Sequence, residues 1–400
     1  MGVSKRGRLA VLVLLVVASI GVAAAPAGAQ PMSFDVVVGQ PLEGAPGESM
    51  RFLPDRLSVA QGDTIDFSVG PAHTTTLLPS GEVPEDWIEA FANDLDDPWS
   101  FPTSDPDEGA GAVKINNNAL LPSCGIPGFP ACSYDGTGVV NSGFTDPAGG
   151  VPVEFSVPFD VAPGTTVWAL CLVHNRMRMM IDVVEEAERS DPGTVSADVA
   201  ETIAKDTDWA VTTDQRLRRT QTSHVNAEGQ RVWDVYAGSD NKGVALFDFY
   251  PSRLRIRRGQ MVRFHFGSLT YENHTATFPL ERLPDEPFVT FNCDPDGDAG
   301  PGPDNPPDLP GPPFCTNPTQ LEVDLNPNIV AQQGNGVFRG GDDFENSGER
   351  GEAFEAVALS PYGSDEPWDL KFGKKSQRGG FRYFCGIHPF MRGRVDVKRR

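Results

Sequence analysis

One segment decides the fold: Arg56-Leu57-Ser58-Val59-Ala60-Gln61-Gly62-Asp63-Thr64-Ile65-Asp66-Phe67. Apolar and polar residues alternate on both sides of a turn that contains Gly62, which is typical of half-buried β-strands and predicts a hairpin. The same pattern returns as Arg253-Leu254-Arg255-Ile256-Arg257-Arg258-Gly259-Gln260-Met261-Val262-Arg263-Phe264. The chain therefore predicts an all-β fold that occurs twice.

The duplicated segment belongs to a longer internal repeat. His73-Thr74-Thr75-Thr76 corresponds to His274-Thr275-Ala276-Thr277. The period is on the order of 200 residues, which indicates duplicated domains rather than the short units of a solenoid. Many short strands with Gly- and Pro-rich turns predict two tandem Greek-key β-sandwich domains. We expect these domains to occupy residues 30–185 and 230–400.

Two long insertions and a linker interrupt the repeat. The insertions cover roughly residues 80–150 and 281–364, and their content of Pro, Gly, Asp and Asn predicts irregular loops. Residues 186–229 have no counterpart in the first half, so we interpret them as a linker. A short helix is expected in this linker, because three apolar residues are spaced by four: Val195, Val199 and Ile203.

The N-terminus has the pattern of a secretory signal. Basic residues from Lys5 to Arg8 precede an apolar run from Leu9 to Ala25, and Ala27-Gly28-Ala29 follows as a cleavage site. We interpret residues 1–29 as a signal peptide; an uncleaved anchor is the alternative. The mature chain is then expected to be secreted or extracytoplasmic, in a periplasm or cell envelope, without a transmembrane segment.

Six cysteines divide equally between the two halves. In an oxidising compartment, thiols pair into disulfides. The partition that respects the repeat pairs Cys124 with Cys132 and Cys293 with Cys315. One cysteine per half then remains, Cys171 in the first and Cys385 in the second.

Each half ends with the same spacing of metal-binding residues. Cys171-Leu172-Val173-His174-Asn175-Arg176-Met177 and Cys385-Gly386-Ile387-His388-Pro389-Phe390-Met391 are both Cys-x-x-His-x-x-Met. Another histidine lies about a hundred residues upstream in each half, His73 and His274. One thiolate, two imidazoles and one weak axial thioether form the ligand set of a blue, or type 1, copper site.

We therefore predict two type 1 coppers per chain. The first copper is expected to bind His73, Cys171, His174 and Met177, and the second His274, Cys385, His388 and Met391. The axial position of the first site has competing thioethers, Met179 and Met180.

The second loop also carries a family resemblance. The string Phe384-Cys385-Gly386-Ile387-His388-Pro389-Phe390-Met391-Arg392-Gly393 resembles the copper loop of amicyanin, among the plastocyanin-like cupredoxins. The segments 59–67 and 256–264 are similar to the strand segment that precedes the first copper histidine of that family. The resemblance covers the β-scaffold of both halves but not the insertions or the linker. It implies cupredoxin-like domains that transfer electrons.

Three functions compete at this stage. The first is an electron carrier with two blue copper centres. The second is a copper-dependent oxidoreductase of the multicopper-oxidase or nitrite-reductase type, which would need an intersubunit copper. The chain has no His-x-His and no His-Cys-His, and only His224 and His265 remain outside the ligand sets. The third is a cell-surface binding module on a cupredoxin scaffold.

The net charge of the chain indicates which classes of partner it could bind. The full chain has a net charge of −22. Residues 30–185 contain 22 acidic and 5 basic side chains, a net of −17, whereas residues 230–400 contain 24 and 20, a net of −4. This balance argues against nucleic acid, whose binders carry clustered positive charge. A cationic redox partner protein is compatible with the first half; a solvated acidic surface is the alternative. The oligomeric state is left open.

Overall fold

The computed structural model describes residues 30–85, 87, 103–104, 112–114, 122–125, 130–145, 153–172, 174, 176–266, 272–282, 289–292, 322–351, 364 and 366–399. The interpretation of residues 1–29 as a signal peptide lies outside these ranges, as does the expected Cys293–Cys315 disulfide. In the described part of the chain, no helix has the length and hydropathy needed to cross a bilayer.

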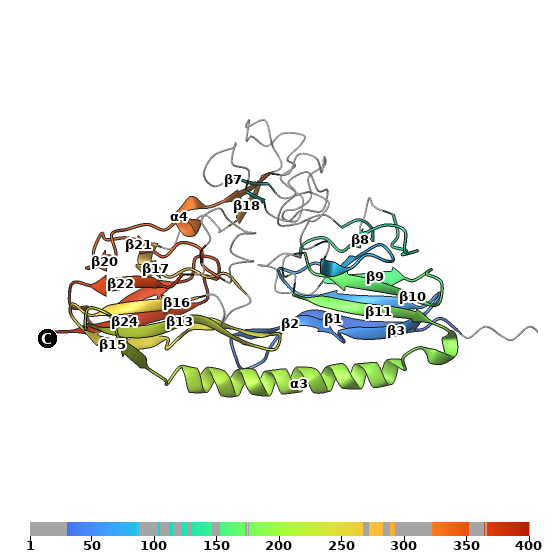
Figure 1. Ribbon diagram of the computed structural model, residues 1–400, viewed down its shortest axis with the longest axis horizontal. Helices are drawn as coiled ribbons and strands as arrows, with labels where there is room; N and C mark the ends of the chain where they lie inside the picture. The colour runs from blue at the N-terminus through green and yellow to red at the C-terminus, as the bar shows by residue number, and fades with distance from the viewer. Residues whose placement is uncertain are drawn as a thin grey trace, which may run out of the picture. The chain divides into compact units, whose positions relative to one another are not determined.

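The fold consists mainly of β-sheet, and the two-sandwich prediction is confirmed (Figure 1). One five-stranded sheet belongs to the first half, in the order β3 (Arg56–Ala60), β11 (Arg178–Val184), β10 (Thr165–Leu170), β5 (Thr76–Leu77) and β8 (Val140–Asn141). Its equivalent in the second half has the order β15 (Arg253–Arg257), β24 (Arg392–Lys398), β23 (Phe381–Phe384), β17 (Thr277–Phe278) and β21 (Glu345–Asn346).

Each of these sheets packs against part of a ten-stranded sheet that both halves share. From the second half it contains β20 (Val337–Phe338), β22 (Trp368–Phe372), β16 (Met261–His265), β13 (Arg231–Asn241) and β14 (Val244–Tyr250). It continues into the first half with β2 (Gly47–Leu53), β1 (Ser33–Pro41), β4 (Thr64–Val69) and β9 (Val153–Pro158), and β12 (Thr222–Val225) pairs with β13. The halves join through antiparallel pairing of β14 with β2.

The predicted hairpin at residues 56–67 is wrong in one respect. Strand β3 pairs with β11, whereas β4 pairs with β1 and β9, so the two strands lie in different sheets. Leu57 and Val59 of one sheet and Ile65 and Phe67 of the other are all buried in the same core. The apolar alternation is the same for a hairpin and for a turn between facing sheets, because both bury every second residue.

The linker contains a much longer helix than predicted. Helix α3 spans Pro192–Leu217, after the 3-10 turn η1 (Glu186–Glu188), and the Asp191 side chain caps its N-terminus by accepting from the Thr194 amide at 2.8 Å. Beyond Ile203 its buried face is largely polar, with these residues: Asp206, Ala210, Thr213 and Asp214. Apolar periodicity detects only the first turns of such a helix. The predicted domain boundaries stay predictions, although β12 pairs with β13 of the second half.

A partly buried ion pair and two buried hydrogen bonds hold α3 against the shared sheet. Arg51 on β2 donates to both Asp206 oxygens at 2.7 and 2.8 Å, and the Ser49 hydroxyl donates to the same carboxylate at 2.7 Å. The hydroxyl of Tyr250 on β14 donates to Asp214 at 2.9 Å. The helix is therefore fastened to strands from both halves.

Asp206→Ala is expected to lower the free energy of unfolding by about 2 kcal/mol, because Arg51 and Ser49 would lose their buried acceptor. The exposed Asp208 on the same helix provides the control, and Asp208→Ala should change stability by less than about 0.5 kcal/mol. Urea denaturation of the two variants measures the difference. Equal losses would show that the Asp206 contacts do not fasten the helix.

Parts of the insertions are ordered against the sandwiches, contrary to the prediction of wholly irregular loops. Strand β8 pairs with β5, and β21 pairs with β17. A four-stranded sheet joins the two insertions in the order β18 (Val289–Asn292), β19 (Glu322–Leu325), β7 (Ala112–Lys114) and β6 (Thr103–Ser104). The described part of the second insertion also contains two short helical segments, η2 (Leu280–Arg282) and α4 (Pro327–Val330).

The cysteines of the described residues separate into paired and free. Cys124 and Cys132 form a disulfide, with Cα atoms 4.9 Å apart. Cys171 and Cys385 are free and completely buried. Their buried thiols are therefore available for another role.

Candidate metal centres

The first candidate centre contains His73, Cys171 and His174. His73 lies in the connection between β4 and β5, and Cys171 follows β10 directly, so the paired strands β5 and β10 bring the two residues together. His174 comes from the loop that leads to β11. The Cys171 Sγ atom is 3.7 Å from the Nδ1 atoms of both histidines, which are themselves 2.9 Å apart. Their ligand atoms form one of two such clusters in the described part of the chain.

The second centre repeats this arrangement with His274, Cys385 and His388. The Cys385 Sγ atom is 3.9 Å from His274 Nδ1 and 3.8 Å from His388 Nδ1. The two Nδ1 atoms are 3.2 Å apart. Strand β17 and strand β23 are neighbours that hold His274 and Cys385 at the same edge of the sheet. The structure therefore brings the predicted His, Cys and His together in both halves.

These distances fit a metal ion. With bonds of about 2.0 Å to nitrogen and about 2.3 Å to sulfur, a trigonal plane separates N from S by about 3.7 Å and N from N by about 3.5 Å. The N–S distances agree, and the N–N distances are somewhat shorter. All four histidines direct Nδ1 toward sulfur, so Nδ1 is the nitrogen that would bind. Two imidazoles with one thiolate suit copper.

Backbone amides contact both sulfur atoms. The Thr74 amide donates to Cys171 Sγ at 3.4 Å, and the Thr275 amide donates to Cys385 Sγ at 3.3 Å. Each threonine hydroxyl in turn accepts from the residue after the cysteine, Leu172 at 2.8 Å and Gly386 at 2.7 Å. Such outer contacts orient the ligand and tune the metal. The repeat therefore extends beyond the ligands to the bonds that hold them.

The loop that carries the predicted axial methionine has the same closure in both halves. The Cys171 amide donates to the Met177 carbonyl at 3.0 Å, and the Met177 amide donates to the His174 carbonyl at 2.7 Å. The bonds of Cys385, Met391 and His388 are equivalent, at 3.1 and 2.8 Å. Met177 and Met391 are both buried. At Met179 and Met180 the strand β11 has begun, and there Met179 packs in the core.

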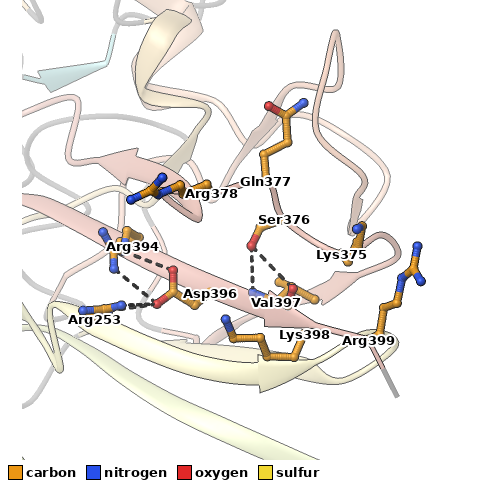
Figure 2. Close-up of a pocket in the computed structure, with 11 residues that line it drawn as sticks. Arg253, Lys375, Ser376, Gln377, Arg378, Arg394, Asp396, Val397, Lys398 and Arg399 are labelled. Carbon is orange, nitrogen blue, oxygen red and sulfur yellow. Dashed lines mark hydrogen bonds and ion pairs between the residues drawn. The ribbon is translucent and has the colours of Figure 1, made fainter.

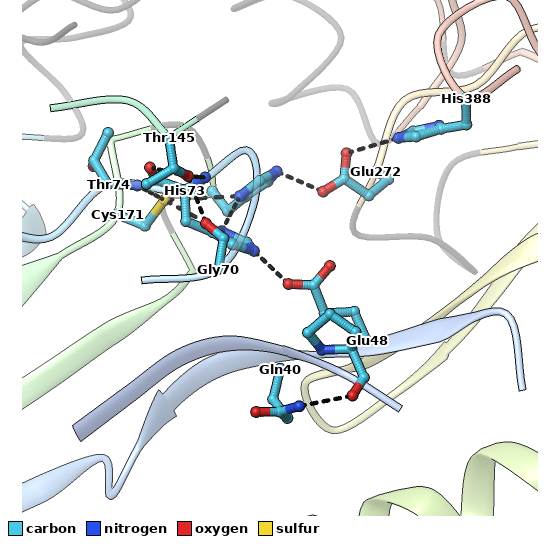
Figure 3. Close-up of polar contacts among 11 residues, drawn as sticks. Gln40, Glu48, Gly70, His73, Thr74, Thr145, Cys171, Glu272 and His388 are labelled. Carbon is cyan, nitrogen blue, oxygen red and sulfur yellow. Dashed lines mark hydrogen bonds and ion pairs between the residues drawn. The ribbon is translucent and has the colours of Figure 1, made fainter. Parts of the chain in front are cut away.

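Two carboxylates missed by the sequence analysis contact the outer nitrogens of these histidines (Figure 3). Glu48 Oε1 on β2 is 2.5 Å from His73 Nε2, and Glu272 Oε1 is 2.5 Å from His174 Nε2. The other oxygen, Glu272 Oε2, is 3.9 Å from His388 Nε2. An ordinary acidic residue gives no sequence pattern, and Glu272 acts on a histidine of the other half, so only the fold reveals these contacts.

These carboxylates make the two triads electrostatically different. Burial lowers the pKa of His73, but Glu48 and the Cys171 thiolate outweigh it and raise the pKa to about 9. Burial also raises the pKa of Cys171, but its contacts with His174 and His73 hold that pKa well below its usual value. In the second triad, burial raises the pKa of Cys385, and it lowers that of His274. The first triad therefore pairs a Cys171 thiolate with protonated histidines, which would have to lose their protons for a metal to bind.

A repeated tripeptide supports the first histidine of each centre. In the first half, Asn141 Oδ1 accepts from the Thr76 hydroxyl at 2.9 Å, and Ser142 Oγ accepts from the Thr75 amide at 2.8 Å. Asn346 and Ser347 make the same bonds, at 2.9 and 2.8 Å, to the equivalent residues of the second half. Asn-Ser-Gly occurs at residues 141–143 and 346–348, so aligning the insertions with one another would have found it.

The two histidines outside the triads lie together. His224 on β12 and His265 on β16 both contact Asp234 Oδ1 on the strand between them, at 3.0 and 2.9 Å. Both are partly exposed. The Tyr236 ring stacks on His265 with centroids 4.6 Å apart. With all six histidines described, no third imidazole from this chain joins the pair.

A cationic hollow lies at the edge formed by β15 and β24 (Figure 2). Asp396 lies within it and pairs with Arg253 at 2.7 Å and with Arg394 at 3.2 Å. Ser376 bonds to the backbone of Val397. The hollow contains no member of either triad. It is a locally basic surface, although acidic and basic side chains are nearly equal in number across residues 230–400.

Comparisons with solved structures include several copper proteins. No family model and no curated protein matches the chain. A Cu-containing nitrite reductase from Thermus scotoductus SA-01 is similar at 13% identity and a TM-score of 0.21, over 92% of this chain and 68% of that one. The multicopper oxidase mgLAC shows 12% identity and a TM-score of 0.19, over 62% and 66%.

A third similar structure is the blue copper oxidase from Nitrosomonas europaea. It shows 10% identity and a TM-score of 0.19, over 92% of this chain and 86% of that one. Similarities this weak do not indicate a function, which has to be inferred from the residues of the chain itself.

Proposed function

We propose that this chain is an extracytoplasmic electron-transfer protein with two type 1 copper centres on cupredoxin-like domains. The observation that carries the proposal is the duplication of the whole site: two triads of Nδ1, Nδ1 and Sγ, each with an amide on sulfur and a buried methionine in the same closed loop. Chance would not preserve all these contacts twice. The Cys124–Cys132 disulfide fits an oxidising compartment.

Copper held by these residues would supply a one-electron couple whose ligands stay the same in both oxidation states. The protein's contribution is to fix the ligands and exclude water. His73, Cys171, His274 and Cys385 are almost completely buried, and the Thr74 and Thr275 amides stabilise negative charge on sulfur. A rigid, dry site needs little rearrangement when the electron moves.

The second centre offers a route for electrons at the surface. The Phe390 side chain is 62% exposed, and its ring meets the His388 ring edge-on, with centroids 5.8 Å apart. An exposed aromatic residue beside a ligand is suited to contact with a redox partner. For the first half, the net charge of −17 across residues 30–185 supports a cationic partner protein.

Stopped-flow mixing tests the function. The reduced, copper-loaded protein should be oxidised by a cationic cupredoxin or cytochrome, and the rate should fall as salt increases from 0.01 to about 0.15 M, because screening weakens steering. An anionic carrier of similar potential is the control and should react more slowly at low salt. Failure to exchange with any carrier protein would contradict the proposal.

One observation favours the oxidoreductase alternative: the convergence of His224 and His265 on Asp234. A subunit neighbour could complete a further copper site there. Copper analysis distinguishes the readings, since the alternative requires more than two coppers per chain, with the excess lost in His265→Ala. Oxygen-dependent turnover of phenolic substrates would likewise support the alternative.

A further inference from the structure

We propose that Glu272 is a bridge through which the two copper centres exchange electrons within one chain. This inference rests on the proposed function and extends it, since two centres that exchange electrons form a relay and not two separate carriers. The observation behind it is that one carboxylate lies between a ligand histidine of the first half and a ligand histidine of the second (Figure 3).

The contacts form a path with one through-space step. Cys171 and His174 belong to the first triad, and His174 directs Nδ1 inward and Nε2 outward to Glu272 Oε1 at 2.5 Å. The second oxygen, Oε2, is 3.9 Å from Nε2 of His388, whose Nδ1 faces Cys385. The path from one triad to the other therefore consists of two imidazole rings and one carboxylate.

Hydrogen bonds within the second half hold the short segment that carries Glu272. It precedes Asn273 and His274, so the bridge and a ligand of the second centre share one short segment. Asn273 is buried and donates to Glu349 at 2.8 Å. The amides and carbonyls of His274 and Arg350 exchange two backbone bonds, at 2.7 and 2.9 Å. A segment held in this way keeps the carboxylate in place.

Aromatic packing closes the same region. Phe247 on β14 stacks on the His388 ring, with centroids 5.3 Å apart and planes 21° apart, and lies 6.4 Å from the His274 ring. It contacts the cores of both halves. Its strand pairs with β2, which carries Glu48 opposite Ala245. Side-chain exposures of 11% for His174, 13% for Glu272 and 17% for His388 leave little room for bulk water in the path.

Electron tunnelling decays steeply across empty space and much less across covalent and hydrogen bonds. The path is bonded from His174 to Glu272, at 2.5 Å, and crosses space only over the 3.9 Å between Glu272 Oε2 and His388 Nε2, so it outperforms a wholly empty gap of the same length. The step is a one-electron exchange: the reduced centre loses one electron, the oxidised centre gains it, and no proton or bond is transferred. Glu272 also lies beside ligand histidines of both centres, whereas Glu48 lies beside His73 of the first.

The test compares three variants of the full copper-loaded chain. Pulse radiolysis adds less than one electron per molecule, and the redistribution between centres is followed with reference spectra from Cys171→Ser and Cys385→Ser. Glu272→Gln is expected to slow redistribution about tenfold, the scale typical for loss of an outer-shell partner. Glu272→Asp keeps the charge but shortens the reach, and it should also slow the step. The remote, exposed Glu281→Gln should not.

Nitrogen-15 NMR of the Cu(I)-loaded protein gives a readout independent of electron transfer. Glu272→Gln should shift the Nε2 resonances of one histidine in each half, His174 and His388, whereas Glu48→Gln should shift that of His73 most, because Glu48 Oε1 is 2.5 Å from His73 Nε2. Shifts confined to one half would contradict the bridge, as would unchanged redistribution in both Glu272 variants with both centres loaded. Absence of copper bands in the unmodified chain would instead contradict the proposed function.

Discussion

Cys385→Ser is expected to abolish one of two thiolate-to-copper absorption bands in the copper-loaded chain and to leave the other intact. The band requires a soft sulfur donor, and a serine hydroxyl cannot replace it. The two bands are separable in this way because each triad is complete within one sandwich, with Sγ–Nδ1 distances of 3.7–3.9 Å in both. Visible absorption with copper analysis measures the loss.

Cys171→Ser is the reciprocal variant and should remove the remaining band. Cys124→Ala is the matched control, because it removes a cysteine that forms the disulfide and touches neither triad. This control should lower stability by about 2 kcal/mol, the low end of the range for a disulfide that closes a short loop, while both bands persist. Loss of both bands in either Cys→Ser variant would contradict two independent centres.

Gly39→Ala is expected to remove copper from the first centre alone. Gly39 lies at a bulge in β1 with φ of +65°, and a Cβ atom there would come within 2.1 Å of the His73 ring and 2.5 Å of Glu48 Oε1. The His73 side chain is 1% exposed and its Nε2 contacts Glu48, so the ring cannot move aside without losing that contact. We expect copper content to fall by one ion per chain.

Gly62→Ala separates crowding from backbone strain. Gly62 has φ of +91°, but nothing lies within 4 Å of an added Cβ. Both variants therefore pay a strain cost of about 1–2 kcal/mol, and only Gly39→Ala displaces a ligand. Copper analysis and thermal unfolding of the two proteins make the comparison. Retention of both coppers by Gly39→Ala would show that the His73 position is not fixed by the bulge.

Features that depend on local residue patterns could be predicted from the sequence. Period-two alternation predicted strands, and the spacing of Cys171, His174 and Met177 predicted a loop that the structure closes on itself. The repeat also predicted that His73 lies near Cys171 and His174, because His274 precedes the equivalent loop in the second half. Alternation could not decide whether β3 and β4 pair, since facing sheets and hairpins bury the same residues. The buried face of α3 includes Asp206 and Asp214, which an apolar pattern cannot reveal.

The link between the centres depends on long-range geometry. Glu272 is adjacent to its own ligand segment in sequence, yet its closest contact is with His174 of the other half. That contact exists because β14 pairs with β2, a register that no local motif encodes. The repeated Asn-Ser-Gly at residues 141–143 and 346–348 was within reach of the sequence, since alignment of the insertions displays it.

We propose that each half binds one copper through a cysteine thiolate. The most direct test is the visible absorption spectrum of the oxidised, copper-loaded mature chain together with its copper content. We expect two coppers per chain and intense thiolate charge-transfer absorption that disappears fully on reduction. One copper or none after loading, or two coppers without thiolate absorption, would contradict it.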